Sequence, residues 1–336
     1  MTEVPPVVAG NVATALAQAA AAAGHAPSVH NTQPWRWRVL PDRLELYAVR
    51  ERQLSAIDPG GRLLLTSCGT ALHHAVLALR AEGWQVRVEP LPDPARPDLL
   101  ASLVPTGHDA PADGAMRLVQ SMSVRHTDRR PVSDTPVPAS AIEAIRRAAE
   151  EFAHLQVLDA DQIFDLAAAA SRAAETEADD PQVREELAYW TGRAAPTGTG
   201  LPAEVLPDQP AQTTVPGRDF GPGSLPMGPG HDRRATYGLL YGDDDEPGGW
   251  FAAGEALSAA WLTATGLGVS VVPLSWVVEV EVTREILHRA LSGMGYPYLV
   301  LRLGIADPDQ AGPPHTPRLA ADQVIDTSAV RGGSAG

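Results

Sequence analysis

The stretch HAPSVHNTQPWRW, His25 to Trp37, links an N-terminal helix to a strand. Trp35 and Trp37 enter that strand on alternate positions, so both point to the same face. Four polar side chains stand in the loop before them: Ser28, His30, Asn31 and Gln33. Such a loop suits a flat ring ligand that needs hydrogen-bond partners along one edge and an apolar wall behind it. A capped turn packed by two tryptophans would also account for the pattern.

Beyond this loop, the chain contains an internal repeat at a constant offset of 185 residues, the separation of Gly69 and Gly254. GTALHHAVLALRAEG (69–83) matches GEALSAAWLTATGLG (254–268) in its Gly, Ala and Leu positions. Apolar residues recur at intervals of three and four residues in both segments, which predicts two helices that are each buried on a wide face. Each helix runs into a β-branched stretch that ends in Pro-Leu. We interpret the repeat as a duplication that makes two related halves; chance similarity of Ala-rich helices is the alternative.

The remaining segments predict a mixture of helices and strands, and therefore an α+β fold. WRWRVL (35–40) and RLELYAV (43–49) are short strands separated by a turn, and YPYLVLRLGIA (296–306) suits a central strand covered on both faces. The stretch 140–153 is an amphipathic helix in which Ser140 and Glu143 predict a capping box. A strand at 155–159 and a helix from about 161 to 177 follow.

We expect an N-terminal half at residues 1–110 and a C-terminal half at residues 111–336. Residues 191–234 are rich in Pro and Gly and lack either period, which is typical of a functional lid or a disordered linker. The segment contains apolar side chains that a solvated linker would not need: Leu201, Val205, Leu206, Phe220 and Met227. The lid is therefore favoured.

Composition excludes several classes of protein. The net charge of -15 and the pI near 5.0 argue against nucleic acid or an anionic membrane as a partner. No apolar run is long enough to span a bilayer, and the Ala-rich N-terminus indicates an amphipathic helix rather than a signal peptide. The single cysteine, Cys68, excludes an internal disulfide framework, so a cytoplasmic location is expected.

The chain has no lysine, so all 26 of its Lys-plus-Arg residues are arginine. A phosphate-loop lysine and a Schiff-base lysine are therefore excluded. Any phosphate must be held by arginine, backbone N–H groups or hydroxyls. The cluster SVRHTDRRP (123–131), with Arg125, Arg129 and Arg130, is the candidate anion clamp, although a solvated basic loop would look the same.

Two shorter segments add candidates. ATGLGVSVVPLSW (264–276) places Leu267 and Gly268 at a helix-to-strand junction, where small residues let backbone N–H groups approach a ligand. An ordinary glycine helix end is equally consistent with that pattern. HTPR (315–318) brings a further arginine, Arg318, near the C-terminus.

These motifs together resemble the nitroreductase superfamily, and HNTQPW in particular resembles its Acg-like subgroup. The resemblance implies that Pro27, Ser28, His30 and Asn31, with Gln33 in the same loop, meet the ring of flavin mononucleotide (FMN). It implies that Arg125, Thr127 and Arg129 hold the phosphate and ribityl chain, with Leu267 and Gly268 near the ring and Arg318 near the phosphate. His126 and Thr127 depart from the superfamily, which often has Arg and Ser there.

In ordinary nitroreductases each flavin is held by two subunits. Here the first half carries HNTQPW without an upstream Arg-Ser element, and the position in the second half that corresponds to HNTQPW falls near Pro216, inside the predicted lid. Parts for one complete site remain. The resemblance therefore implies a fused pseudo-dimer with one FMN, as a monomer or a weak homodimer.

The family's reaction moves hydride from NAD(P)H through flavin to a small organic acceptor, with no catalytic side chain. We expect donors such as Asn31 and the Gly268 backbone to stabilise charge on the reduced ring. An FMN-sequestering protein whose lid blocks turnover is the alternative, and a biosynthetic dehydrogenase on the same fold is a third reading.

Other chemistries lack support in the sequence. Adjacent His73 and His74 have no partner at metal-ligand spacing, so no metal is expected. The acidic run 243–246 lacks the spaced oxygens of a calcium loop. Gly-x-Ser-x-Gly is absent, and the glycines of 221–230 lack the context of a dinucleotide fingerprint.

Overall fold

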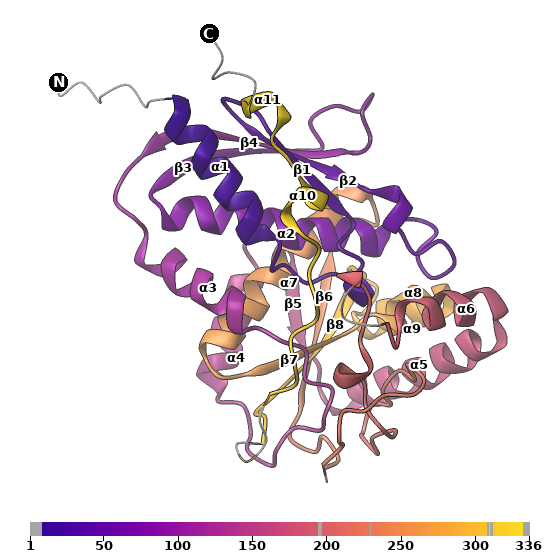
Figure 1. The fold of residues 1–336 in the computed structure, drawn as a ribbon. Coiled ribbons are helices and arrows are strands. Elements are labelled where there is room, and N and C mark those ends of the chain that lie inside the picture. The colour runs from indigo at the N-terminus through magenta and orange to yellow at the C-terminus, as the bar shows by residue number, and fades with distance from the viewer. Residues whose placement is uncertain (1–8, 194–196, 229, 308, 310–311, 332–336) are drawn as a thin grey trace.

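Two β-sheets, one above the other in Figure 1, organise the chain. The computed structural model describes residues 9–193, 197–228, 230–307, 309 and 312–331. The first sheet has the order β3-β4-β2-β1-β9 and the second the order β5-β6-β8-β7. The sheets are mostly antiparallel, and the single parallel pair is β1 with β9.

The first sheet is built almost entirely from the N-terminal part of the chain. Its strands are β1 (Trp35–Val39), β2 (Leu44–Ala48), β3 (Trp84–Pro90), β4 (Leu99–His108) and β9 (Ile325–Asp326). The helices of this part are α1 (Ala9–Ala23), α2 (Arg62–Ala81) and α3 (Asp113–Val124), with short 3-10 turns at η1 (Val29–Asn31) and η2 (Arg50–Arg52). Trp35 and Trp37 are fully buried on one face of β1, as their alternation predicts.

The second sheet comes from the C-terminal part. Its strands are β5 (His154–Val157), β6 (Thr236–Gly242), β7 (Ser270–Leu274) and β8 (Tyr296–Gly304). Its helices are α4 (Ala139–Ala149), α5 (Ala160–Asp179), α6 (Pro181–Trp190), α7 (Pro247–Gly266), α8 (Trp276–Glu279) and α9 (Glu281–Ala290), with η4 at Ala203–Val205. Every residue of β8 except the first is buried, and β8 lies between β6 and β7, so the predicted central strand is confirmed.

Helices α2 and α7, the two copies of the repeat, pack against each other at equivalent positions. A Cβ on Gly69 would collide with the Phe251 carbonyl, and a Cβ on Gly254 would collide with the Thr66 carbonyl. The two contacts exchange under the 185-residue offset, which is the reciprocal pattern of a two-fold interface. Glycine is required at both positions because the helix backbones touch there. The reciprocal contacts of α2 and α7 are thus those expected at the two-fold axis of the predicted pseudo-dimer.

The C-terminal segment crosses back to the first half. In Figure 1 the yellow end of the chain runs up from the second sheet to α10 (Ala321–Val324), β9 and α11 (Ser328–Arg331) beside β1. Trp37 and Arg38 of β1 pair with Ile325 and Asp326 of β9. The division of the chain at residue 110, which falls between β4 and α3, stays a prediction.

The predicted capping box at Ser140 and Glu143 is wrong. Helix α4 begins at Ala139 after Pro138, and no side chain caps its N-terminus. Because Pro138 fixes the entry to the helix, Ser140 already lies inside it, and Glu143 instead binds Arg146. No helix among the described residues combines the length and the apolar character needed to cross a membrane.

Candidate functional site

A cavity of about 370 Å³ lies where elements of both halves meet. Its walls come from the loop at 27–31, from α2 and α7, from the loop at 125–129, from the end of β7 and from the C-terminal segment at 316–318. The Pro/Gly-rich residues 191–234, called the Pro/Gly segment from here on, supply a further wall, including Pro216. We call this space the arginine cavity. Its volume is in the usual range for small-molecule sites, roughly 300–1,000 Å³.

Most of the residues singled out in the sequence meet in the arginine cavity. The N-terminal loop contributes Pro27, Ser28, His30 and Asn31. The C-terminal part contributes Arg125, Thr127, Arg129 and Arg318. Four other candidates do not line the cavity: Gln33, His126, Leu267 and Gly268.

The N-terminal loop is held in an unusual backbone conformation. His30, Asn31 and Gln33 have φ of 44°, 57° and 49°, which non-glycine residues rarely adopt. The backbone N–H of Gln33 donates to the Ser28 hydroxyl at 2.9 Å, and the N–H of Val29 donates to a hydroxyl of α2 at 3.1 Å. Strain of this kind persists where surrounding structure over-determines it, which is a mark of ligand-binding loops.

Asn31 is committed to the protein rather than to a ligand. Its amide N–H groups donate to the backbone carbonyls of Gly200 (3.1 Å) and Pro317 (2.9 Å), and its oxygen accepts from Arg318. The expectation that Asn31 donates to the flavin ring therefore needs correction, because both protons are already used. Asn31 instead joins the N-terminal loop, the Pro/Gly segment and the C-terminal segment.

Gln33, two residues after Asn31, also forms its side-chain hydrogen bonds within the protein. Its amide donates to the Gly198 carbonyl at 2.7 Å and its oxygen accepts from the backbone N–H of Leu319 at 3.0 Å. Polar side chains of this loop that the sequence predicted to contact a ligand thus partly form hydrogen bonds within the protein.

Arg125 and Arg318 lie side by side at one end of the arginine cavity. Both guanidinium groups donate to the His25 carbonyl, each at 3.3 Å. Arg125 also stacks over the Trp261 ring at 4.3 Å, and Arg318 donates to the Thr316 hydroxyl at 2.6 Å. The Nε atoms of both arginines are buried without a hydrogen-bond partner. This end of the cavity therefore has unused cationic donors.

The backbone on either side of Arg129 is held by Arg302 and its partner Asp232, two residues that the sequence did not single out. Arg302 of β8 donates at 2.8 Å to the carbonyls of Asp128 and Arg130, the residues on either side of Arg129. Arg302 is itself paired with Asp232 at 2.9 Å, and Asp232 also accepts from the Val132 N–H. The guanidinium of Arg129 donates to the Val205 carbonyl and stacks over Phe220.

The arginines of this region differ in whether they form an ion pair with a carboxylate. Arg130 and Arg302 each have a carboxylate partner, but no ion pair between described residues includes Arg125, Arg129 or Arg318. Desolvation lowers the pKa of Arg125 to about 9 and the pKa of Arg129 and Arg318 to about 10. All three remain cationic at neutral pH, so the cavity wall carries one buried and two half-buried positive charges in a strongly acidic protein.

Arg218 ties the Pro/Gly segment, which lines part of the cavity, to α5 and α8. Its guanidinium lies 3.0 Å from a Glu177 carboxylate oxygen and 2.9 Å from one of Glu279. It also approaches the His30 ring nitrogen at 3.3 Å. Burial, followed by Arg218 and Arg129, depresses the pKa of His30, so this imidazole stays neutral. The predicted apolar anchors Leu201, Val205 and Leu206 are buried, with Phe220 packed against them.

Leu267 and Gly268 lie outside the arginine cavity, in contrast to the sequence-based expectation. Leu267 is half exposed at the end of α7, and the Gly268 N–H is already bonded to the Thr265 carbonyl. The motif forms an ordinary helix end in this structure, and its predicted contact with the flavin stays a prediction. The cavity wall comes from residues 273–276, a few positions further along, at the end of β7.

His126 also points elsewhere. Its ring meets His315 edge to face, with centroids 6.0 Å apart, and it contacts the Val124 carbonyl. Among described residues, no group of three or more His, Cys, Asp or Glu side chains is placed to hold a metal ion. His73 and His74 instead share the hydroxyl of Ser258 on α7, at 2.8 and 3.0 Å.

Sequence reasoning missed Arg302, Asp232 and Arg218. A lone arginine in the apolar run of β8 was a usable signal, because a charge in a buried strand needs a partner. Arg218 and Asp232 lie in or beside a segment without periodicity, where sequence offers no indication of which face a residue takes.

Comparison with known proteins adds the following findings. No family model matches the chain. A Mycobacterium tuberculosis protein named "Putative NAD(P)H nitroreductase" is 39% identical over 314 residues, 90% of this chain and 88% of the relative. The "Putative NAD(P)H nitroreductase acg" of the same organism is 31% identical over 309 residues, 89% of this chain and 92% of the relative.

Solved structures with partial similarity include the FMN-dependent nitroreductase NfnB from Mycobacterium smegmatis in complex with NADPH. It has a TM-score of 0.40 at 15% identity and spans 64% of this chain and 100% of that one. A nitroreductase with bound FMN from Bacteroides fragilis has a TM-score of 0.37 at 14% identity, over 60% and 95% of the two chains.

Proposed function

This chain belongs to the NAD(P)H nitroreductase family, and from that premise we propose that it is an FMN-dependent oxidoreductase. Hydride passes from NAD(P)H through the flavin to a small organic acceptor. The observation that carries the proposal is a set of three arginines, the buried Arg125 and the half-buried Arg129 and Arg318, that line one cavity with no carboxylate ion-pair partner among described residues.

The donors present fit FMN. A phosphate monoester brings up to two negative charges and several acceptor oxygens, which match guanidinium groups that are buried and partly unbonded. Arg125 and Arg318 would hold the phosphate together with the Thr316 hydroxyl, and Arg129 would face the rest of the molecule. When bound, FMN would supply the hydride-transfer chemistry, which protein side chains do not provide.

The chain's own residues bind, orient and exclude water. The loop at 27–31 and the end of β7 both form parts of the cavity wall, and they come from different halves of the molecule. The Pro/Gly segment covers the cavity, and the ion pairs of Arg218 hold it there. No side chain needs to act as a nucleophile. A cytoplasmic location and an oligomeric state of monomer or weak homodimer stay predictions.

The test begins with the purified protein. Denaturation should release one yellow ligand with the mass of FMN per chain, and addition of NADH or NADPH without oxygen should bleach the visible flavin absorbance. A protein that neither co-purifies with FMN nor binds added FMN would refute the proposal.

A second candidate function is FMN sequestration without turnover. It is favoured by one observation, the buried Arg218 with two carboxylate partners, which fixes the Pro/Gly segment against the cavity. In that case dithionite would bleach the bound flavin while NADH and NADPH would not. Bleaching by either nicotinamide at a rate that supports turnover would reject sequestration.

A further inference from the structure

One buried group of the arginine cavity has no partner in the protein. Tyr237, on β6, lines the cavity and is 2% exposed, yet its hydroxyl proton has no acceptor among the described residues. Two other tyrosines differ, because the hydroxyl of Tyr47 donates to Glu45 and that of Tyr298 donates to the Asp244 carbonyl. A buried O–H without an acceptor is costly, and native proteins rarely leave one.

The sheet places Tyr237 in a defined part of the cavity. Tyr237 pairs with Arg302, and Arg302 pairs with Val272 on the other side, so the three residues form one row across β6, β8 and β7. All three line the cavity, and Val215 of the Pro/Gly segment lines it too. The Val215 backbone lies near the Tyr237 oxygen; an N–H there donates and cannot accept the hydroxyl proton.

The electrostatic surroundings define what Tyr237 can bind. Burial, followed by Asp232, raises the pKa of Tyr237, so the hydroxyl keeps its proton throughout the physiological range. The nearest charges, Asp232 and Arg302, neutralise each other at 2.9 Å. Tyr237 therefore offers a neutral donor to the cavity, whereas Arg125 offers a cationic one. The complementary ligand atom is an uncharged carbonyl-type oxygen.

We infer that the Tyr237 hydroxyl donates a hydrogen bond to a carbonyl oxygen of a molecule held in the inner part of the arginine cavity. The inference rests on the proposed function, because FMN binding defines the occupied cavity. The oxygen has two possible sources, a ring carbonyl of the bound flavin or a carbonyl of a second small molecule. Trp276, whose indole N–H is also buried without a partner, lines the same cavity.

The test compares wild type with Tyr237→Phe and with Tyr241→Phe, a control on the same strand that does not line the cavity. The melting temperature of the ligand-free protein is measured first. Tyr237→Phe removes an unsatisfied donor but also the oxygen that faces the Val215 N–H, so the two changes should offset each other and the variant should melt close to the wild-type temperature. A clear drop, absent in Tyr241→Phe, would mean that the hydroxyl serves the folded protein itself and would overturn the inference.

Ligand affinity then identifies the source of the oxygen. FMN binding is measured by flavin fluorescence quenching, and benzamide, a neutral carbonyl probe, is titrated into the FMN-loaded protein by its effect on the flavin spectrum. A loss of about tenfold in FMN affinity for Tyr237→Phe assigns the bond to the flavin. A similar loss confined to benzamide assigns it to a second molecule.

The outcomes also separate this inference from the proposed function. Wild-type protein that binds no FMN would reject both. Wild-type protein that binds FMN, with Tyr237→Phe matching it within twofold for FMN and showing no loss for benzamide, would reject the donor role of Tyr237 alone. Benzamide that fails to bind, together with unchanged FMN affinity, has the same meaning.

Discussion

Two cavities adjoin in this molecule, and they differ in how their charges are partnered. The arginine cavity shares Leu63 and Thr66 with a second space of about 290 Å³, called the side pocket here. The side pocket is also lined by charged and aromatic residues: Asp58, Arg62, Trp250, Glu279, Glu281, Arg284 and Tyr298. By volume and polarity alone, either space could hold a small molecule.

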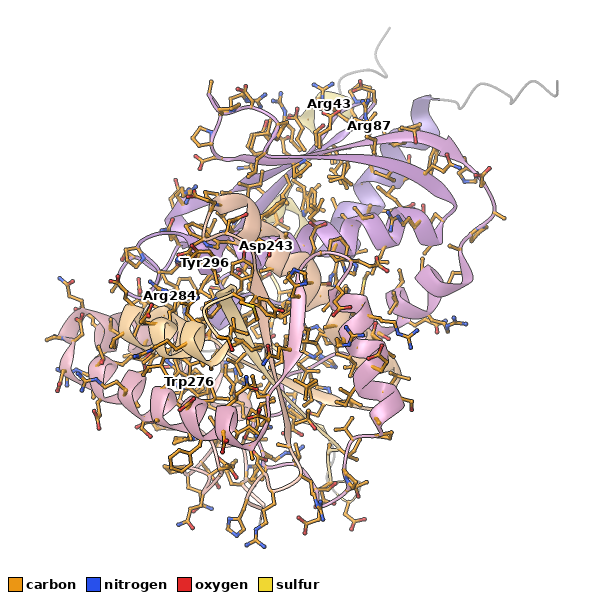
Figure 2. All side chains as sticks on the ribbon, turned by 180° about the vertical axis from the view of Figure 1, so that it is seen from behind. Arg43, Arg87, Asp243, Trp276, Arg284 and Tyr296 are labelled. Carbon is orange, nitrogen blue, oxygen red and sulfur yellow. The ribbon has the colours of Figure 1, made fainter. Side chains whose placement is uncertain are left out.

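The side pocket satisfies its own polar groups. Arg62 is paired with Asp245 and stacks over Trp250 at 4.6 Å. Arg284, labelled in Figure 2, donates to the Val278 and Glu279 carbonyls. No buried side-chain atom without a partner belongs to a residue that lines the side pocket, within the described part of the chain.

The arginine cavity is the opposite case. Arg125, Arg318 and Tyr237 all leave buried donors unbonded there. An unpaired buried charge destabilises the ligand-free protein, and an anion that binds there removes that cost. Unsatisfied buried donors, rather than empty volume, therefore distinguish the arginine cavity from the side pocket.

The largest expected effect follows from removal of an unpaired cation. Arg125→Ala should weaken FMN binding by about 100-fold, because a buried guanidinium that contacts phosphate typically contributes a few kcal/mol. Arg284→Ala, in the side pocket, should change FMN affinity by less than about twofold. Fluorescence titration of the ligand-free proteins measures both. Equal losses in the two variants would break the distinction between the cavities.

The second effect concerns the support of Arg129. Arg302→Lys should weaken FMN binding by about tenfold, because lysine can pair with Asp232 but lacks the planar fork that reaches two carbonyls at once. In a double-mutant cycle with Arg129→Ala the two losses should not add, since both act through the same side chain. Additive losses would show that Arg302 does not act through Arg129.

The third effect lies at the wall between the two cavities. Arg218→Gln removes the cation that joins the Pro/Gly segment to Glu177 and Glu279, so FMN should dissociate about five times faster, a loss of about 1 kcal/mol. Glu281→Gln, on the side-pocket face, is the matched control. Stopped-flow release into excess riboflavin-binding protein measures the rate. An unchanged rate in Arg218→Gln would remove the basis for a pinned segment.

The smallest expected effect on FMN is that of Asp58→Asn in the side pocket, where no change in affinity is expected. Stability should nevertheless respond to pH. Burial raises the pKa of Asp58 from 3.8 to about 6 in the folded protein. The folded state therefore binds this proton more tightly than the unfolded state, and the associated stability, complete below about pH 4, is lost as the pH rises through about 6.

Chemical unfolding at several pH values tests this sign. The free energy of unfolding of Asp58→Asn should improve relative to wild type between about pH 4 and pH 6, and the difference should then level off. A difference that is constant with pH would mean that Asp58 titrates normally. Loss of FMN affinity in this variant would mean that the side pocket is part of the ligand site.

Much of the architecture was predictable because it rests on local pattern. The repeat around Gly69 and Gly254 predicted two equivalent helices, and their glycines do meet at the axis. The alternation of Trp35 and Trp37 predicted a one-sided strand, and the apolar run of β8 predicted a central one. The capping box failed because the helix begins two residues earlier, with Pro138 in place of Ser140 at the N-cap position, so Ser140 lies inside the helix.

The sequence predicted which residue types form the candidate site, but it did not predict their hydrogen-bond and ion-pair partners. Residues with unusual chemistry in short loops, such as Arg125 and Asn31, were found correctly as members of one cavity. Their partners were not: the bond from Asn31 to Pro317 spans 286 residues, and that from Arg302 to Asp128 spans 174. Leu267 and Gly268 do not line the cavity, and the sequence could not indicate this, because a helix end looks the same whether it faces a ligand or solvent.

The amino-acid sequence alone determined that the chain has two related halves and that any phosphate must be held by arginine, backbone N–H groups or hydroxyls. These follow from composition and short-range spacing. Tertiary structure alone decided which arginines are neutralised and which are left for a ligand. That choice depends on carboxylates and carbonyls brought together from distant segments, and electrostatic partnership acts through space without regard to position along the chain.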